Sequence, residues 1–227
     1  PGIVAALSAF LYEHGADIME STQFSSDDPS RMFYIRFEFF LEGLIHVREK
    51  MEQDFEVLAD QFDMEVTFTY NDERKRSAIF VSKEVHCLLE LLWEWQSGDL
   101  DMDIPLVISN HEDAREVVEP LGIPFYYIPA NKDIREEVEA KQINLMKEYD
   151  IDVIILARYM QILTPHFVEQ FPNQIINIHH SFLPAFIGAH PYERAYERGV
   201  KLIGATSHYV TNELDEGPII DQDIERV

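Results

Sequence analysis

The sequence is poor in cysteine and in basic residues, and it has no long apolar run. Its single cysteine, Cys87, excludes an internal disulfide and fits the reducing conditions of the cytoplasm. Its 18 Lys and Arg face 42 Asp and Glu, so the formal net charge is −24 and a surface that tracks nucleic-acid phosphates is not expected. No apolar run approaches the ~20 residues of a membrane helix, and no charged-then-apolar leader opens the chain. We therefore expect a cytoplasmic protein that binds neither nucleic acid nor membranes.

Several ligand-binding and catalytic motifs are also absent. The first strand of the second segment runs into 82–86 without a glycine, so neither GxGxxG nor a P-loop offers a phosphate cradle. Four histidines, at 179, 180, 190 and 208, are close in sequence, but adjacent histidines on a strand point to opposite faces. The HExxH pattern fails at the fifth position of 111–115. Ser181 follows a histidine but lacks the GxSxG elbow, so its hydroxyl is expected to order a turn. We expect no metal and no cofactor.

Residues 1–71 carry the alternating patterns of an α+β unit. Apolar residues recur at helical spacing after Ile3, and Gly15 ends that helix. The order αββαβ lacks one strand of the βαββαβ ferredoxin-like unit, so we expect a strand to precede Pro1. The predicted helices and strands lie at 3–14, 16–23, 33–39, 47–62 and 64–70, with a turn at 27–30.

Residues 76–227 are predicted to form a second domain, after a charged connector at 71–76. Strands and helices alternate there, which indicates a mostly parallel sheet with helices on both faces. We expect a further helix beyond Val227, because the sequence stops inside the last strand. Strands are predicted at 78–81, 105–109, 124–128, 151–156, 175–179, 202–210 and 218–227, and helices at 86–96, 113–121, 133–149, 163–170 and 191–198. For the last two strands, the pattern leaves both a parallel and an antiparallel arrangement open.

Two polar side chains end the predicted strand at 175–179. Because side chains alternate along a strand, Asn177 and His179 project from one face and His180 from the other. Ligands of such sheets bind beyond the carboxyl ends of the strands. An amide donor beside an imidazole suits polarising a carbonyl and moving protons. On spacing alone, two polar residues that close a strand in a solvated loop remain the simpler interpretation.

Asp215 is a candidate partner for this pair. A solvated aspartate in a Leu-Asp-Glu-Gly-Pro turn is common. If the loop folds over the strand ends, Asp215 faces His179 and raises its pKa, which keeps the imidazole protonated at neutral pH. An amide, an imidazolium and a carboxylate then surround one carbonyl carbon. His180 has two interpretations, as a second polar group that positions water or as a packed histidine on the opposite face.

Two motifs resemble the signature of the formyltetrahydrofolate-using transferases and hydrolases. The first is NIHxSxLP at 177–184, and the second is LDxGP at 214–218. The resemblance spans 76–227 and implies a Rossmann-like, mostly parallel α/β domain of the formyltransferase type. Stretches at 82–84, 106–111 and 179–186 are also similar to this family.

The first segment resembles an ACT domain in its start at 1–4, its first helix and the strand at 17–18. That resemblance implies pairing with another ACT unit, hence a homodimer or homotetramer, and an amino-acid effector such as glycine or methionine. A dimerisation module that binds nothing is the open alternative. The order of the two domains is similar to the formyltetrahydrofolate deformylase family.

This family implies hydrolysis of 10-formyltetrahydrofolate to tetrahydrofolate and formate, which balances one-carbon folate pools and supplies formate for purine synthesis. Asn177 would donate a hydrogen bond to the formyl oxygen, and His179 would stabilise the oxyanion and assist proton transfer to N10. Asp215 would hold His179 and help activate water. Arg158 either faces the folate glutamate or is an ordinary surface residue. The pterin would lie against Met160, Gln161, Ile162, Leu163, Val210, Thr211, Asn212, Glu213 and Leu214.

Three other functions are weighed against hydrolysis. Glycinamide ribonucleotide formyltransferase is similar in its motifs, but it implies a glycine-rich anion loop where this chain has 82–86. Without that loop, water is the expected acceptor. The net charge of −24 disfavours methionyl-tRNA formyltransferase. Intact Asn177, His179 and Asp215 argue against an amino-acid sensor with an inactive transferase domain.

Overall fold

The computed structural model describes residues 2–26, 32–130, 134–185 and 191–227. The chain divides into two compact units, Pro1–Asn71 and Asp72–Val227. Five predicted features lie outside the described residues: Pro1 of the start at 1–4, the turn at 27–30, the start of a helix at Asp133, Phe186 of the extended motif, and His190.

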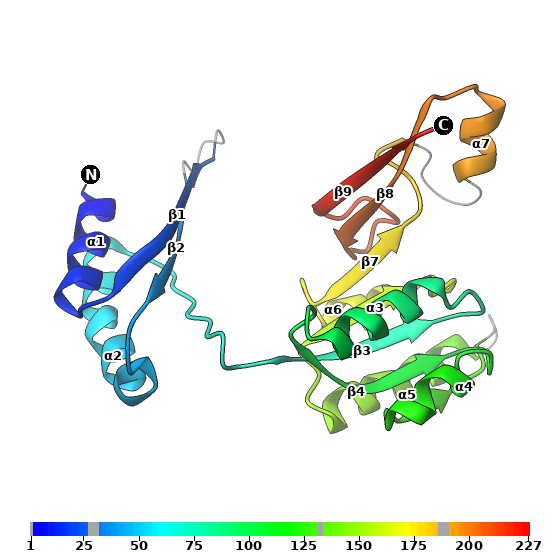
Figure 1. Ribbon diagram of the computed structural model, residues 1–227, viewed down its shortest axis with the longest axis horizontal. Helices are drawn as coiled ribbons and strands as arrows, with labels where there is room; N and C mark the ends of the chain where they lie inside the picture. The colour runs from blue at the N-terminus through cyan, green and yellow to red at the C-terminus, as the bar shows by residue number, and fades with distance from the viewer. Residues whose placement is uncertain (1, 27–31, 131–133, 186–190) are drawn as a thin grey trace. The chain divides into compact units, whose positions relative to one another are not determined.

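The first unit contains two helices and an antiparallel strand pair (Figure 1). Gly15 adopts a left-handed φ of 75°, which allows the chain to leave the first helix. Phe10, Met51 and Phe55 belong to the buried core between the two helices, and alternate residues of the second strand pack against that core. The elements are α1 (Ile3–Glu13), β1 (Asp17–Ser25), β2 (Phe33–Phe40) and α2 (Leu44–Phe62).

The strand predicted at 64–70 is wrong, because this segment has no regular secondary structure. The alternation of apolar and polar residues in this segment nevertheless identifies side chains that pack against the core. Met64 and Phe68 pack against the core, and the Phe68 ring meets the Phe55 ring edge-on at a centroid distance of 5.4 Å. A strand also requires a neighbour for its backbone hydrogen bonds. Among the described residues of this unit, β1 and β2 pair only with each other.

The second unit is built on a seven-stranded sheet in the order β5-β4-β3-β6-β7-β8-β9 (Figure 1). The first five of these strands are parallel, as the sequence predicted, and β8 and β9 take the antiparallel arrangement that the sequence left open. The strands are β3 (Lys75–Val81), β4 (Met102–Ser109), β5 (Phe125–Tyr127), β6 (Val153–Ala157), β7 (Ile175–His179), β8 (Leu202–Tyr209) and β9 (Ile219–Arg226). The helices are α3 (His86–Ser97), α4 (Arg115–Val118), η1 (Glu119–Leu121), α5 (Arg135–Glu148), α6 (Pro165–Gln170) and α7 (Pro191–Glu197).

The helix predicted at 113–121 is shorter and changes type. Its α-helical part is α4, and the chain continues as the 3₁₀ turn η1 around Pro120. Proline has no backbone N–H to donate, so the α-helical hydrogen-bond pattern cannot continue through Pro120.

Helices cover both faces of the central strands. Ala78 and Phe80 point to a core shared with α5 and α6, whereas Ile79 and Val81 point to a core shared with α3 and α4. All four side chains are fully buried. Burial on both faces explains why β3 reads as a continuous apolar run. In such a sheet, a ligand reaches the strands at their carboxyl ends. Within the described residues, no helix combines the length and the apolar character needed to cross a membrane.

Candidate active site

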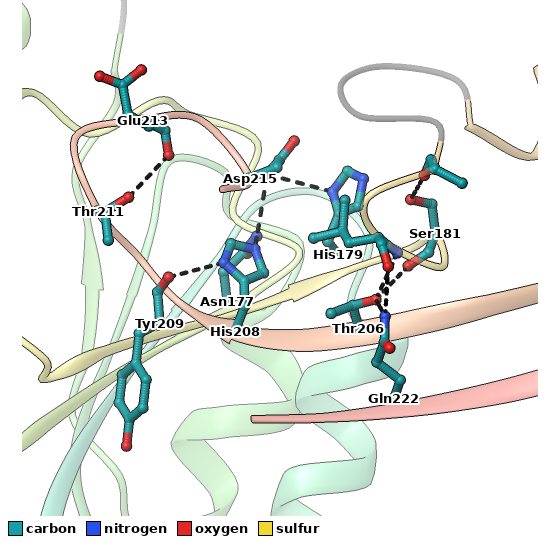
Figure 2. Close-up of polar contacts among 12 residues, drawn as sticks. Asn177, His179, Ser181, Thr206, His208, Tyr209, Thr211, Glu213, Asp215 and Gln222 are labelled. Atoms are coloured by element: carbon teal, nitrogen blue, oxygen red, sulfur yellow. Dashed lines mark hydrogen bonds and ion pairs between the residues drawn. The ribbon is translucent and has the colours of Figure 1, made fainter. Parts of the chain in front are cut away.

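The three predicted catalytic residues come together beside the end of β7. His179 is the last residue of β7, and Asp215 lies in the loop that connects β8 to β9. Nδ1 of His179 is 3.6 Å from Oδ1 of Asp215, with side-chain exposures of only 7% and 8% (Figure 2). Asn177 lies two residues earlier on the same strand. The site therefore brings an amide, an imidazole and a carboxylate together, and the imidazole and the carboxylate are largely buried.

A fourth polar residue, His208, was not predicted to belong to the site. It lies on β8 directly opposite Asn177 in the antiparallel register, and its side chain is 2% exposed. Its Nε2 is 3.2 Å from Nδ2 of Asn177 and 3.9 Å from Oδ1 of Asp215 (Figure 2). The signal in the sequence was a histidine inside a predicted strand, but its partner depends on the β7–β8 register, which the sequence does not specify.

The loop that carries Asp215 closes over the end of β8 through a backbone contact. The N–H of Tyr209 donates to the carbonyl of Pro218 at 2.9 Å. Between these residues, a Cβ on Gly217 would lie 1.7 Å from the Tyr209 carbonyl oxygen, so only glycine allows this approach. Asp215 itself has a left-handed φ of 58°, which aspartate tolerates better than most residues. The LDxGP motif thus has a local structural reason for its glycine.

A hydrogen-bond network fixes the chain that leaves β7. Ser181 Oγ donates to the carbonyl of Ala185 at 2.8 Å, which confirms that its hydroxyl orders a turn. Thr206 Oγ1 donates to the Ser181 carbonyl at 2.7 Å and accepts from the Leu183 N–H at 3.0 Å. The Gln222 amide donates to the Leu183 carbonyl at 2.9 Å. Strands β8 and β9 therefore hold the segment after His179 in place (Figure 2).

His180 does not follow the predicted alternation, because β7 ends at His179. The centroids of the two histidine rings are 5.4 Å apart, and the His180 ring meets the Tyr192 ring edge-on at 5.6 Å. The ring of His180 therefore lies close to that of His179 instead of being directed to the far side of the sheet.

The segment after β6, expected to bind the pterin, is anchored at both ends. The N–H of Met160 donates to Ser82 Oγ at 2.9 Å, and that hydroxyl donates to Oδ1 of Asn110 at 2.7 Å. At the other end, the N–H of Thr164 donates to the buried carboxylate of Glu139 at 2.8 Å, and the Thr164 hydroxyl donates to the same carboxylate. Ser82 and Glu139 were not predicted to contribute, and both act by positioning this backbone.

The segment and helix α5 together line a small cavity. Gln161, Ile162 and Leu163 contribute to its wall, whereas Met160 is 58% exposed and does not. Tyr159 also lines the cavity, and burial raises the pKa of its hydroxyl. Its oxygen accepts a hydrogen bond of 2.9 Å from the amide of Gln142, a fully buried residue.

The five expected substrate residues on the β8–β9 loop lie in different environments. Val210 packs against the core, and the hydroxyl of Thr211 donates to the carbonyl of Glu213 at 3.2 Å. Asn212 is exposed, and Leu214 is 51% exposed. None of these five described residues lines the cavity beside α5.

The described residues contain no group of three or more His, Cys, Asp or Glu side chains arranged to hold a metal ion. The only cysteine, Cys87, is half-buried on α3. Burial raises the pKa of its thiol, and the nearby Arg158 partly opposes that shift.

Comparison with known proteins gives a consistent result. Residues 75–227 match the formyl transferase family. A formyltetrahydrofolate deformylase from Bacillus subtilis is 65% identical over the whole chain and 76% of its own length. The crystal structure of a formyltetrahydrofolate deformylase from Pseudomonas syringae superposes with a TM-score of 0.93 at 46% identity, covering the whole chain and 76% of that protein. A phosphoribosylglycinamide formyltransferase from Bacillus halodurans covers 67% of the chain and 80% of its own, with a TM-score of 0.63 and 32% identity. The chain therefore belongs to the formyltetrahydrofolate deformylase family, and its second unit is a formyltransferase-type α/β domain.

Proposed function

We propose that the second unit hydrolyses 10-formyltetrahydrofolate to tetrahydrofolate and formate. The carrying observation is the contact between His179 and Asp215, at 3.6 Å and nearly buried, with Asn177 on the same strand. Formyltetrahydrofolate deformylases at up to 65% identity support the same reaction. By releasing formate, the reaction would balance one-carbon folate pools and supply purine synthesis.

The proposed hydrolysis proceeds by addition of water, proton transfer and cleavage of the C–N10 bond, and Asn177, His179 and Asp215 each assist one or more of these steps. Water adds to the formyl carbon, and the resulting oxyanion accepts a hydrogen bond from the Asn177 amide and is stabilised by the His179 imidazolium. Asp215 orients His179 through Nδ1 and accepts a proton from the attacking water. The C–N10 bond then breaks, N10 gains a proton by way of His179, and formate leaves. Asp215 returns the proton of the water to His179, so each turnover consumes one water and forms one N–H bond, one formate and one released proton.

The folate would extend from this catalytic group along the segment after β6. Backbone groups of Met160, Gln161, Ile162 and Leu163 suit the donor and acceptor edge of a pterin, because the segment is held at both ends by Ser82 and Glu139. The residues on the opposite wall are proposed to be Val210, Thr211, Asn212, Glu213 and Leu214. No cofactor is needed, because the folate is itself the substrate.

Water is favoured as acceptor by the environment of Ser82. Its hydroxyl already joins Asn110 and the backbone of Met160, and its side chain is buried, so this corner offers no free glycine-rich loop for a phosphate. Formyl transfer to glycinamide ribonucleotide is the alternative that the more distant structural relatives suggest.

A formate-release assay tests the proposal. The wild-type protein should release formate from 10-formyltetrahydrofolate without any amine, and glycinamide ribonucleotide should not change the rate. Asn177→Ala should lower kcat by ~10²–10³, the usual effect of removing an oxyanion donor. Asn71→Ala, at an exposed position of the connector, is the matched control and should retain full activity. Near-normal turnover by Asn177→Ala rejects the assigned role.

We also propose that the first unit is a ferredoxin-like ACT domain that pairs in a cytoplasmic homodimer or homotetramer. The order of α1, β1, β2 and α2, and the exposed apolar side chains Met19, Phe24 and Phe40 on the strand pair, support a pairing surface. Light scattering tests the oligomer, and thermal shifts with glycine or methionine test the effector. A monomer that neither amino acid stabilises rejects this second proposal.

A further inference from the structure

The hydrogen bonds of His208 define which ring nitrogen carries its proton. Nδ1 is 2.9 Å from the carbonyl oxygen of Tyr209. A carbonyl oxygen can only accept, so Nδ1 must donate and carries the proton. In the neutral ring, Nε2 then has a lone pair and can only accept.

Nε2 of His208 faces the amide of Asn177. The distance to Nδ2 of Asn177 is 3.2 Å, and an acceptor at this place matches the amide nitrogen and repels the amide oxygen. The bond joins two strands at residues that are directly opposite each other in the register. An amide that could otherwise rotate by half a turn is thus held in one orientation.

We propose that His208 is a positioning residue that fixes the Asn177 amide with its NH₂ end toward the reacting carbonyl. This inference rests on the proposed function of Asn177 as the oxyanion donor. One N–H of the amide is bonded to His208, and the second N–H of the same nitrogen remains for the formyl oxygen. A rotated amide would present its carbonyl oxygen there and would repel the developing negative charge.

The carboxylate of Asp215 lies near the hydrogen bond between His208 and Asn177, and it could favour a doubly protonated His208 instead. Oδ1 of Asp215 is 3.9 Å from Nε2 of His208, and the same oxygen is 3.6 Å from Nδ1 of His179. A doubly protonated His208 would direct an N–H toward Asp215 and would require the Asn177 amide to turn its oxygen inward. The shorter contact of Asp215 is to His179, which leaves the lone pair of His208 for Asn177. The protonation state of His208 therefore distinguishes the two arrangements.

Kinetic analysis of two His208 variants tests the positioning role. His208→Leu removes the acceptor and should lower kcat by roughly 10–10² while KM stays within about threefold, a smaller loss than that of Asn177→Ala. His208→Gln can place an amide oxygen near the position of Nε2 and should recover most of the lost rate. His46→Leu, an exposed histidine of the first unit, is the control and should behave as wild type.

A double-mutant cycle separates positioning from general structural damage. In the Asn177→Ala background, His208→Leu should cost less than about threefold more, because the group that it positions is already gone. An equal cost with and without Asn177, or no recovery by a folded His208→Gln, overturns the inference.

Nitrogen NMR of the wild-type protein gives a readout that does not depend on turnover. The inference expects His208 to show a protonated Nδ1 and an unprotonated Nε2 at neutral pH, with the Nε2 resonance shifting in Asn177→Ala. A protonated Nε2 overturns it even if both His208 variants are inactive. If the wild type releases no formate, the proposed function fails, and the NMR result still decides how the Asn177 amide is held.

Discussion

Gly217→Ala should disable the site without touching any catalytic side chain. A Cβ at this position would lie 1.7 Å from the carbonyl oxygen of Tyr209, where ordinary contact begins at 3.4 Å. The backbone must therefore move by 3.4 − 1.7 = 1.7 Å, or share that shift between the two strands. The neighbouring hydrogen bond from Tyr209 to Pro218 would weaken, and the loop carrying Asp215 would lift away from His179.

The size of the effect follows from this displacement. A misplacement of ~1 Å costs about 10²-fold in rate, so kcat for formate release should fall by roughly that factor. Overpacking of this kind also costs about 1–3 kcal/mol of unfolding free energy, which urea denaturation measures. The variant should remain folded at room temperature, because its two cores are unchanged.

Gly122→Ala is the matched control for backbone strain. Gly122 has a φ of 77°, but a Cβ there would meet nothing within 4 Å. The control should lose about 1–2 kcal/mol of stability from the left-handed conformation and keep its kcat. Full activity in Gly217→Ala, or an equal loss of kcat in both variants, refutes the reasoning about the loop.

Two further outcomes follow from buried polar groups. Glu139→Gln places an amide against the Thr164 N–H and hydroxyl. The free energy of unfolding should therefore fall by about 1–3 kcal/mol, and KM for the folate should rise more than kcat falls. An unchanged KM in steady-state assays contradicts the anchoring role. Burial raises the pKa of the Cys87 thiol, so less thiolate is present near pH 8. Its reaction with a disulfide reagent should therefore be slower than that of glutathione and should accelerate only as the pH rises further. Equal reaction rates for Cys87 and glutathione contradict a buried thiol.

The sequence predicted the order of the elements in the second unit, and it predicted that Asp215 would face His179 near Asn177. Asn177 and His179 were predictable because side-chain alternation and the carboxyl ends of parallel strands are local rules. Asp215 depended on how a distant loop folds, and the resemblance of the motif supplied that information. The contact at 3.6 Å agrees with it.

Other features required information that the sequence does not contain. His208 meets Asn177 only through the antiparallel register of β7 and β8, which no local pattern specifies. Glu139 is buried and accepts hydrogen bonds from the Thr164 backbone and hydroxyl, which lie on a different segment that no helical pattern identifies. The segment at 64–70 alternates as a strand would, but pairing depends on a neighbour and not on its own residues.

The central claim is that water, and no amine, receives the formyl group. The most direct measurement is mass analysis of the formate released from 10-formyltetrahydrofolate in water labelled with heavy oxygen. The account predicts rapid release without an added acceptor, with one solvent oxygen in each formate formed. Formate that appears only at the background rate, together with formyl transfer when glycinamide ribonucleotide is added, would contradict it.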